Sequence, residues 1–193
     1  MYTACGKENI SKTEILKDTC DGPDANISCC FINMPDYISE IMKIAGESEE
    51  GQRMIIKGQI LNEDEKTPYP GILIYAYHTD NNGYYSKKGN EKGIQKWHGY
   101  LHGWCRTNEE GRYEIHSIKP NRYPSNNAPA HIHWAIKKTD GEMSYLNDFV
   151  FSNDSLVNDE YLSYLRSPGD NGVIDLNDNG SGVLTGSRTT ILK

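Results

Sequence analysis

The sequence predicts an all-β fold, a β-sandwich that follows an irregular N-terminal arm. Short apolar segments of strand-like composition recur from Arg53 onward, and turns rich in glycine, asparagine and aspartate separate them. No long helical pattern lies between these segments, so two packed sheets suit the chain better than an alternating α/β architecture. A chain of 193 residues has the length of one domain with an extension.

The segments expected to form strands lie at short, regular intervals. They span residues 54–61, 71–79, 99–107, 113–118, 130–136, 145–151, 173–176 and 183–192. Residues 71–79 are apolar enough to lie centrally in a sheet, and residues 108–112, NEEGR, are typical of a hairpin turn. Residues 152–172 are expected to be irregular or partly helical.

The arm is expected to cover residues 1–50, and the sandwich residues 51–193. The arm is polar, lacks a sustained period and is interrupted by Pro23 and Pro35. Apolar residues between positions 38 and 45 are spaced for one or two short helical turns. We therefore expect the arm to lie against the sandwich.

Charge and hydropathy limit the classes of partner. The net charge is −7 and the sequence pI is about 5.4. A nucleic-acid binder needs a basic face to displace counterions, so nucleic acid is not expected as a partner. No run of about 18 apolar residues is present, and no transmembrane helix is therefore expected.

The cysteines are concentrated near the start of the chain. They are Cys5, Cys20, Cys29, Cys30 and Cys105. Cys29-Cys30 has no CxxC spacing, which argues against a zinc knuckle, and the odd count leaves at least one thiol without a partner. A disulfide among the first four is expected only if the protein is exported.

The first six residues, MYTACG, are similar to the end of a bacterial lipoprotein signal, in which small residues precede a lipidated cysteine. The apolar stretch that normally comes before such a site is absent from the sequence. Two localisations therefore stay open, namely the cell envelope with a lipid anchor at Cys5, and the cytoplasm.

The segment Tyr123–Trp134, YPSNNAPAHIHW, contains the strongest candidate site. Successive side chains of a strand point to opposite faces, so His131 and His133 share one face while Ile132 points toward a core. Two imidazoles side by side form half of a metal site. A sandwich strand can also carry such a pair without any metal, so the pair alone is a weak signal.

Two tyrosines supply the other half of the candidate site. Tyr123 precedes Pro124, which holds it extended, and Tyr85 lies in the loop segment DNNGYYS, residues 80–86. A phenol with a pKa of about 10 is a poor ligand at neutral pH, but a hard, strongly Lewis-acidic cation binds its phenolate. Two phenolates with two neutral imidazoles favour non-haem Fe(III). Either tyrosine also suits an ordinary loop or corner position.

Taken together, the motifs resemble those of the intradiol ring-cleavage dioxygenases, the family of catechol 1,2-dioxygenase and protocatechuate 3,4-dioxygenase. The similarity rests on HTDNNGYYS at 78–86, TNEEGRYEIHSIKPNRYP at 107–124 and PAHIHW at 129–134. It runs from about residue 51 to the C-terminus. It implies a sandwich of transthyretin-like topology.

By position, the resemblance places the family's ferric ligands at Tyr85, Tyr123, His131 and His133, and it gives both tyrosines roles in catalysis. The family's spacing after glycine favours Tyr85 over Tyr84. The resemblance implies a catechol and O2 as small-molecule partners. The expected reaction cleaves the ring between its two hydroxyl-bearing carbons and yields a muconate-type diacid. The oligomeric state is left open.

Two positions depart from the family pattern. Ala128 stands before Pro-Ala-His and His102 before Gly103, where arginine is frequent in the family. Loss of a fixed cation from a dry site lowers the rate roughly a hundredfold, unless Arg106 or Arg122 replaces it. An alternative hypothesis is therefore a catalytically weak or inactive module of the cell envelope that binds iron or a catechol. A third is an envelope-anchored structural domain without metal.

Overall fold

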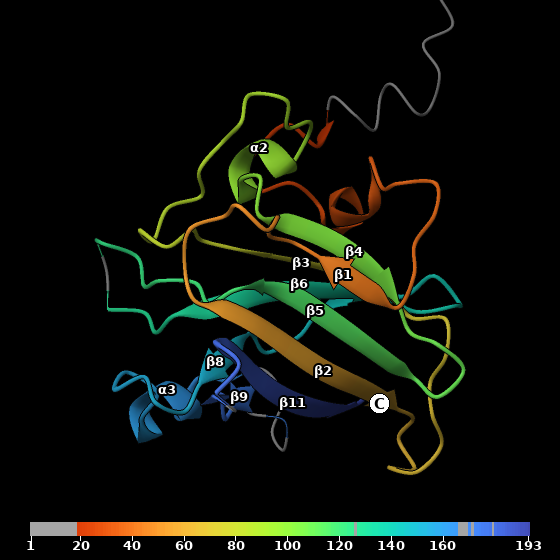
Figure 1. The fold of residues 1–193 in the computed structure, drawn as a ribbon. Helices are drawn as coiled ribbons and strands as arrows, with labels where there is room; N and C mark the ends of the chain where they lie inside the picture. The colour runs from red at the N-terminus through yellow and green to blue at the C-terminus, as the bar shows by residue number, and fades with distance from the viewer. Residues whose placement is uncertain (1–18, 126, 166–169, 171, 179) are drawn as a thin grey trace, which may run out of the picture.

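A computed structural model describes residues 19–125, 127–165, 170, 172–178 and 180–193, and these residues form two β-sheets packed face to face (Figure 1). The predicted all-β sandwich is confirmed. Sheet A contains β1 (Ile41–Lys43), β2 (Arg53–Leu61), β5 (Arg112–Ile118), β10 (Asn177–Asp178) and β11 (Val183–Ile191). Sheet B contains β3 (Leu73–His78), β4 (His102–Arg106), β6 (His131–Lys137), β7 (Met143–Tyr145), β8 (Phe149–Phe151) and β9 (Val173–Ile174).

The strand order in sheet A is β1-β5-β2-β11-β10, and in sheet B it is β4-β3-β6-β8-β9, with β7 also paired to β6. β2 and β5 are antiparallel, whereas β11 pairs with β2 in parallel. β6 lies between β3 and β8 and is therefore central in sheet B. A central strand is a rigid support for any side chains that it projects.

The predicted helical turns between residues 38 and 45 are wrong, because Ile41–Lys43 form the edge strand β1. This strand pairs in parallel with β5, and Met42 lies opposite Ile115. Met42 is 1% exposed, while its two neighbours in the strand are exposed. The open edge of β5 offers hydrogen-bond partners to the backbone of β1 and a place to bury Met42. The spacing of apolar residues along the sequence does not reveal this pairing.

The single strand predicted over residues 145–151 is also wrong, because the structure divides it into β7 and β8. The break falls at Asn147, whose carbonyl oxygen accepts hydrogen bonds from Trp134 Nε1 at 2.8 Å and from Arg188 Nη1 at 3.0 Å. These side-chain donors turn the backbone away from the strand ladder. The position of Asp148, which follows the break, is important for the site described below.

Three short helices complete the described chain: η1 (Ile27–Phe31), α2 (Gln95–His98) and α3 (Asp159–Ser163). α3 agrees with the partly helical character expected for residues 152–172, of which 166–169 and 171 lie outside the described part. α2 was not predicted, since four residues give no helical period. No described helix combines the length and the apolar character that crossing a membrane requires.

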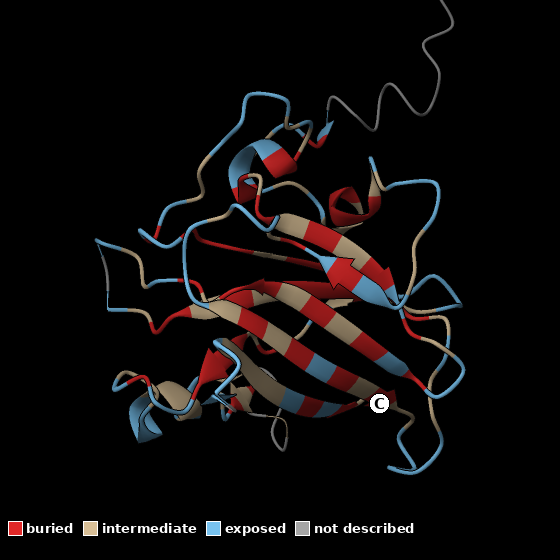
Figure 2. Cartoon of the chain, viewed as in Figure 1, coloured by how far each residue is buried: buried red, intermediate tan, exposed pale blue. Residues whose placement is uncertain are grey.

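The core lies between the sheets, and buried and more exposed residues alternate along β2 and β5 (Figure 2). β6 contributes Ile132 and Trp134, both 0% exposed, to this core. The intervening residues His131 and His133 consequently lie on the outer face of sheet B. Period-two alternation therefore separates the packing residues of β6 from its candidate functional residues.

The segment before β1 covers part of the outer face of sheet B. η1 and its neighbours pack against Tyr75 and Ala135, and a disulfide joins Cys20 to Cys29. The thiol of Cys30 is buried in the same cluster. Cys5, the candidate lipid attachment site, lies outside the described residues. The localisation that the sequence left open stays a prediction.

A close contact between β2 and β5 gives a first testable prediction. Gly58 lies opposite Tyr113, and a Cβ at Gly58 would lie 2.0 Å from Tyr113 Cζ. We expect Gly58→Ala to lower the free energy of unfolding by about 1–3 kcal/mol, because the buried ring has no space to move into. Urea denaturation measures the change. Gly46→Ala is the control, since its Cβ would meet nothing within 4 Å; equal stability of the two variants would contradict the prediction.

Candidate metal centre

β6 presents the two predicted histidines on the outer face of sheet B. Its register places His133 opposite Tyr77 of β3. Nε2 of His131 and Nε2 of His133 are 3.0 Å apart. The two rings therefore converge on one point in front of the strand, as expected for neighbours on the same face.

A carboxylate clamp holds the loop that carries Tyr123. Asp154 accepts a hydrogen bond from Arg122 Nε at 2.9 Å and another from the Ala130 backbone N–H at 2.9 Å. Arg122 precedes Tyr123, and Ala130 precedes His131. One side chain thus fixes both ends of the segment that separates a tyrosine from a histidine of the site.

The loop that carries Tyr85 folds around the side chain of Asp80. Its carboxylate accepts hydrogen bonds from the backbone N–H groups of Asn82 at 2.8 Å and Tyr84 at 3.1 Å, and from the Ser86 hydroxyl at 2.5 Å. The turn leaves Tyr84 57% exposed and directs Tyr85 inward. Of the two adjacent tyrosines, it is Tyr85 that the structure brings to the histidines.

The two tyrosine loops are joined to each other. Thr79 Oγ1 donates a hydrogen bond to the Asn121 carbonyl oxygen at 2.7 Å, and Asn121 Nδ2 donates to the Asn81 carbonyl oxygen at 3.1 Å. Gly83 has a φ of +84°, and a Cβ there would lie 2.0 Å from the Arg122 carbonyl oxygen. This close approach requires glycine, and it sets the distance between the two loops.

Four donor atoms meet where these segments converge. Tyr123 Oη is 2.5 Å from Tyr85 Oη, 3.0 Å from His131 Nε2 and 3.2 Å from His133 Nε2. Ligand atoms bound at right angles to one metal, with bonds of about 2.1 Å, are separated by about 3 Å. The spacing of the four atoms therefore matches part of a first coordination shell.

The four donor atoms make more close contacts with one another than their hydrogen atoms can bridge. His131 Nδ1 lies 2.6 Å from the Pro129 carbonyl oxygen, and His133 Nδ1 lies 3.0 Å from Asp148 Oδ1. Both oxygens only accept, so each Nδ1 carries a proton, and each ring in its neutral form presents a lone pair at Nε2. The two Nε2 atoms face each other without a proton between them. A shared cation satisfies these lone pairs together.

Burial shifts the pKa values of Tyr85, Tyr123 and His131. It raises the pKa of Tyr85 and of Tyr123, and the Asp148 carboxylate adds to the effect at Tyr123. Burial also lowers the pKa of His131, followed by the effect of the neighbouring His133. Both phenols therefore resist ionisation unless a cation of high charge is bound, and the His131 ring stays neutral.

Asp148 is a functional residue that sequence reasoning missed. It orients the ring of His133, in the manner of the carboxylate that commonly supports a metal-binding histidine. Asp148 lies in the irregular stretch between β7 and β8, a region that was predicted to be a strand. No spacing rule links it to His133, so the sequence alone contained no signal for this contact.

Two of the remaining histidines have structural partners away from the centre. Burial lowers the pKa of His78 to about 4, and its Nε2 lies 2.6 Å from Ser117 Oγ. His116 Nε2 lies 2.6 Å from Glu114 Oε2. These contacts give both histidines structural roles.

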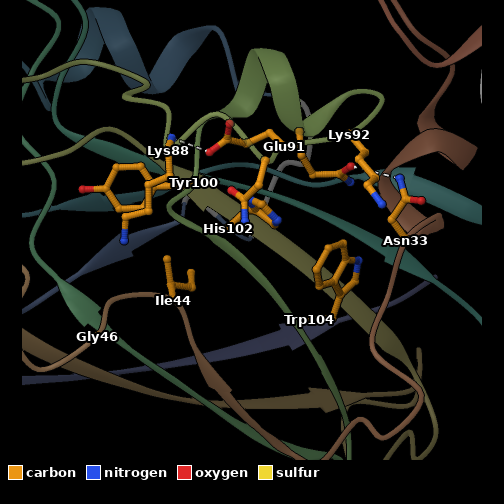
Figure 3. A pocket seen from close by; sticks show the side chains of 11 residues that line it. Asn33, Ile44, Gly46, Lys88, Glu91, Lys92, Tyr100, His102 and Trp104 are labelled. Carbon is orange, nitrogen blue, oxygen red and sulfur yellow. Dashed lines mark hydrogen bonds between the residues drawn. The ribbon is translucent and has the colours of Figure 1, made fainter.

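A cavity of about 520 Å³ lies on the outer side of sheet B (Figure 3), and none of the four donor residues lines it. His102 and Trp104 line it from β4, and Lys88 lies in the loop opposite. Tyr77, which occupies the strand between β4 and β6, stacks on His98 with 3.6 Å between ring centroids. By register, Tyr77 lies between His102, which lines the cavity, and His133 of the candidate metal centre.

Comparisons with known proteins identify the family of the chain. Residues 29–177 match a family model described as Dioxygenase, a match that begins ahead of residue 51. Over 92 residues the chain is 32% identical to the protocatechuate 3,4-dioxygenase beta chain of Burkholderia cepacia, covering 45% of this chain and 39% of that protein. The chain thus spans well under half the length of this curated relative.

Solved structures share the fold. An intradiol ring-cleavage dioxygenase from Tetranychus urticae has a TM-score of 0.61 and 20% identity, covering 81% of this chain and 87% of that chain. Catechol 1,2-dioxygenase from Pseudomonas arvilla C-1 has a TM-score of 0.59 and 19% identity, covering 82% and 59%. The family match extends over most of the sequence and includes all four converging residues. The chain belongs to the intradiol ring-cleavage dioxygenase family.

Proposed function

We propose that the protein is a non-haem Fe(III) dioxygenase that cleaves a catechol-type ring between its two hydroxyl-bearing carbons and forms a muconate-type diacid. The observation that carries this proposal is the meeting of two phenol oxygens and two imidazole nitrogens from three separate segments, with neighbouring atoms 2.5–3.2 Å apart. Membership of the family supports the same reaction.

The four side chains suit a ferric ion in charge and in hardness. Tyr85 and Tyr123 are two oxygen donors that become anionic only beside a strongly Lewis-acidic cation. A less highly charged ion would offset less of the cost of ionising two buried phenols. When bound, Fe(III) supplies Lewis acidity that holds both catechol oxygens and makes the ring reactive toward O2.

The protein's own side chains hold the site and move protons. The Pro129 carbonyl and Asp148 fix the rings of His131 and His133, so that both Nε2 atoms stay directed at one point. Tyr123 Oη touches the other three donor atoms, and we assign to it the acceptance of one catechol proton. Its loop is held by Asp154, so this oxygen can exchange partners while the chain around it stays fixed.

Ala128 stands where arginine is frequent in the family. Because Ala128 is not a proposed ligand, this departure concerns the rate of the reaction and leaves the four proposed ligands in place. The two arginines considered as replacements are occupied elsewhere: Arg122 binds Asp154, and Arg106 donates to the Gly71 carbonyl oxygen at 3.1 Å. Arg106 also lies at the end of β4 remote from His102. The proposed reaction therefore proceeds without a fixed cation from these positions.

The test begins with iron content and colour. Iron-loaded protein is expected to be red-brown from phenolate-to-Fe(III) charge transfer and to consume O2 with catechol or hydroxyquinol. Tyr123→Phe should lose most of the band and the uptake, whereas Tyr84→Phe, which changes an exposed neighbour, should keep both. Colourless protein after loading with iron, or iron-loaded protein without O2 uptake on any catechol, would refute the proposal.

We also propose export to the cell envelope, with lipid attachment at Cys5 as one form of it. The support is the Cys20–Cys29 disulfide, since such bonds persist in oxidising compartments. Thiol alkylation of protein isolated from its native cells, with and without prior reduction, tests the point. Alkylation of both Cys20 and Cys29 without prior reduction would show that the disulfide is absent and would contradict export.

A further inference from the structure

The ring of Tyr77 packs beside two of the proposed ligands, which reach the centre from different segments. Its centroid lies 4.8 Å from the ring centroid of His133 and 5.8 Å from that of Tyr85. His133 is opposite Tyr77 in the register of β3 and β6, whereas Tyr85 belongs to the loop that follows β3. One ring is therefore placed to set the position of the histidine ligand relative to the tyrosine ligand.

His98 holds the Tyr77 ring in place. The two rings are stacked, with centroids 3.6 Å apart and planes inclined by 3°. His98 is buried, and its Nδ1 lies 2.9 Å from Oη of Tyr75, which is buried as well. Tyr75 and Tyr77 are two residues apart on β3 and share one face of the strand, so the same strand carries both the ring and the hydroxyl group that fixes its stacking partner.

The segment that carries His98 is joined to the backbone of the Tyr85 loop. The Tyr100 N–H donates a hydrogen bond to the Ser86 carbonyl oxygen at 2.9 Å. A Cβ at Gly99 would lie 2.8 Å from the same oxygen and 3.0 Å from the Tyr85 carbonyl carbon. The end of α2 thus lies directly against the loop, and the stacked pair is held from the strand on one side and from this loop on the other.

We infer that Tyr77 is a positioning residue of the metal centre, whose ring fixes the orientation of Tyr85 relative to His133 and so the geometry of the bound ion. Tyr77 acts through these two ligands and does not contact the ion in this role. Packing locks the rotamer of a ligand side chain, and a ligand that loses this support can adopt several orientations. The inference rests on the proposed function, because it concerns the iron site of that function.

The test compares variants of Tyr77 in protein saturated with ferric iron. Tyr77→Ala removes the ring, and we expect it to bind iron about tenfold more weakly and to shift and broaden the phenolate-to-Fe(III) band, because Tyr85 loses its fixed orientation. Tyr77→Phe keeps the ring and should bind iron within about twofold of the wild type, with an unchanged band. A residue with a merely structural role would lower the urea midpoint of the iron-free protein and leave the band of the folded protein unchanged.

His102→Ala is the matched control. His102 is partly buried like Tyr77, lies opposite it in the register of β3 and β4, and packs against the Trp104 ring. This variant should keep the iron affinity and the band. Tyr77→Leu, which retains apolar volume without a flat ring, takes the place of Tyr77→Ala if that variant does not fold.

Three results would overturn the inference. They are an unchanged band and affinity in the variant without the ring, a loss in Tyr77→Phe as large as in that variant, and an equal loss in His102→Ala. Iron-loaded wild-type protein without any charge-transfer band would instead refute the proposed function, so the two failures are distinguishable.

Discussion

We expect the double variant His131→Ala/His133→Ala to bind ferric iron more than about a hundredfold more weakly than the wild type and to lose the charge-transfer band. The variant removes both nitrogen donors, and two phenols alone lack the neutral ligands that complete the site. Iron per protein after dialysis, read by elemental analysis, measures the loss.

The same variant should remain folded, because both histidines project from the outer face of sheet B while Ile132 and Trp134 fill the core. Its urea midpoint in the iron-free state is expected to be close to that of the iron-free wild type. His116→Ala, on β5, removes a histidine that pairs with Glu114 and should keep its iron. Full iron content in the double variant would contradict the assignment of both histidines.

Gly83→Ala should weaken iron binding by roughly ten- to a hundredfold although it alters no ligand. A Cβ at Gly83 would lie 2.0 Å from the Arg122 carbonyl oxygen, where the two tyrosine loops meet. Relief of this clash has to move the Tyr85 loop away from the Tyr123 loop. The phenol oxygens, now 2.5 Å apart, would separate and cease to share one ion. Iron affinity measured by competition with a chelator reports the effect.

Gly89→Ala is the matched control for Gly83→Ala. Gly89 has a φ of +90°, close to the +84° of Gly83, but a Cβ at Gly89 would meet nothing within 4 Å. Both substitutions therefore introduce similar backbone strain, of about 1–3 kcal/mol, and only one introduces the contact between loops. Equal losses of iron affinity in the two variants would show that strain, and not the spacing of the loops, is responsible.

The parts of this molecule that follow a local period could be predicted from its sequence. β2, β3, β5 and β6 formed close to their expected bounds. Buried and more exposed residues alternate along β2 and along most of β5 and β6, whereas β3 is an almost continuously buried strand, as expected for a central position. The same alternation placed His131 and His133 on one face. Tyr85 and Tyr123 were candidates from their own chemistry, but family resemblance was needed to assign them as ligands and to favour Tyr85 over Tyr84. Their meeting depends on bonds between two loops that are remote in sequence, such as Thr79 to Asn121.

The features that were missed depend on partners distant in the chain. β1 forms only because β5 has an open edge, and a three-residue strand has too few positions to show a period. The division between β7 and β8 follows from hydrogen bonds that Trp134 and Arg188 donate to one carbonyl group. Asp148 lies beside His133 because of that division, so its contact with His133 could not be predicted from the sequence.

The position of β11 has a consequence for biosynthesis. This strand, which pairs with β2 from Val183 to Ile191, lies between β2 and β10. A ribosome therefore makes the partner of Arg53–Leu61 only after β3 to β10 have been made. Until then the nascent chain presents a bare strand edge, which is prone to pair with other molecules. We therefore expect fragments released before β11 is made to aggregate, even though all four proposed ligand residues are already present in them.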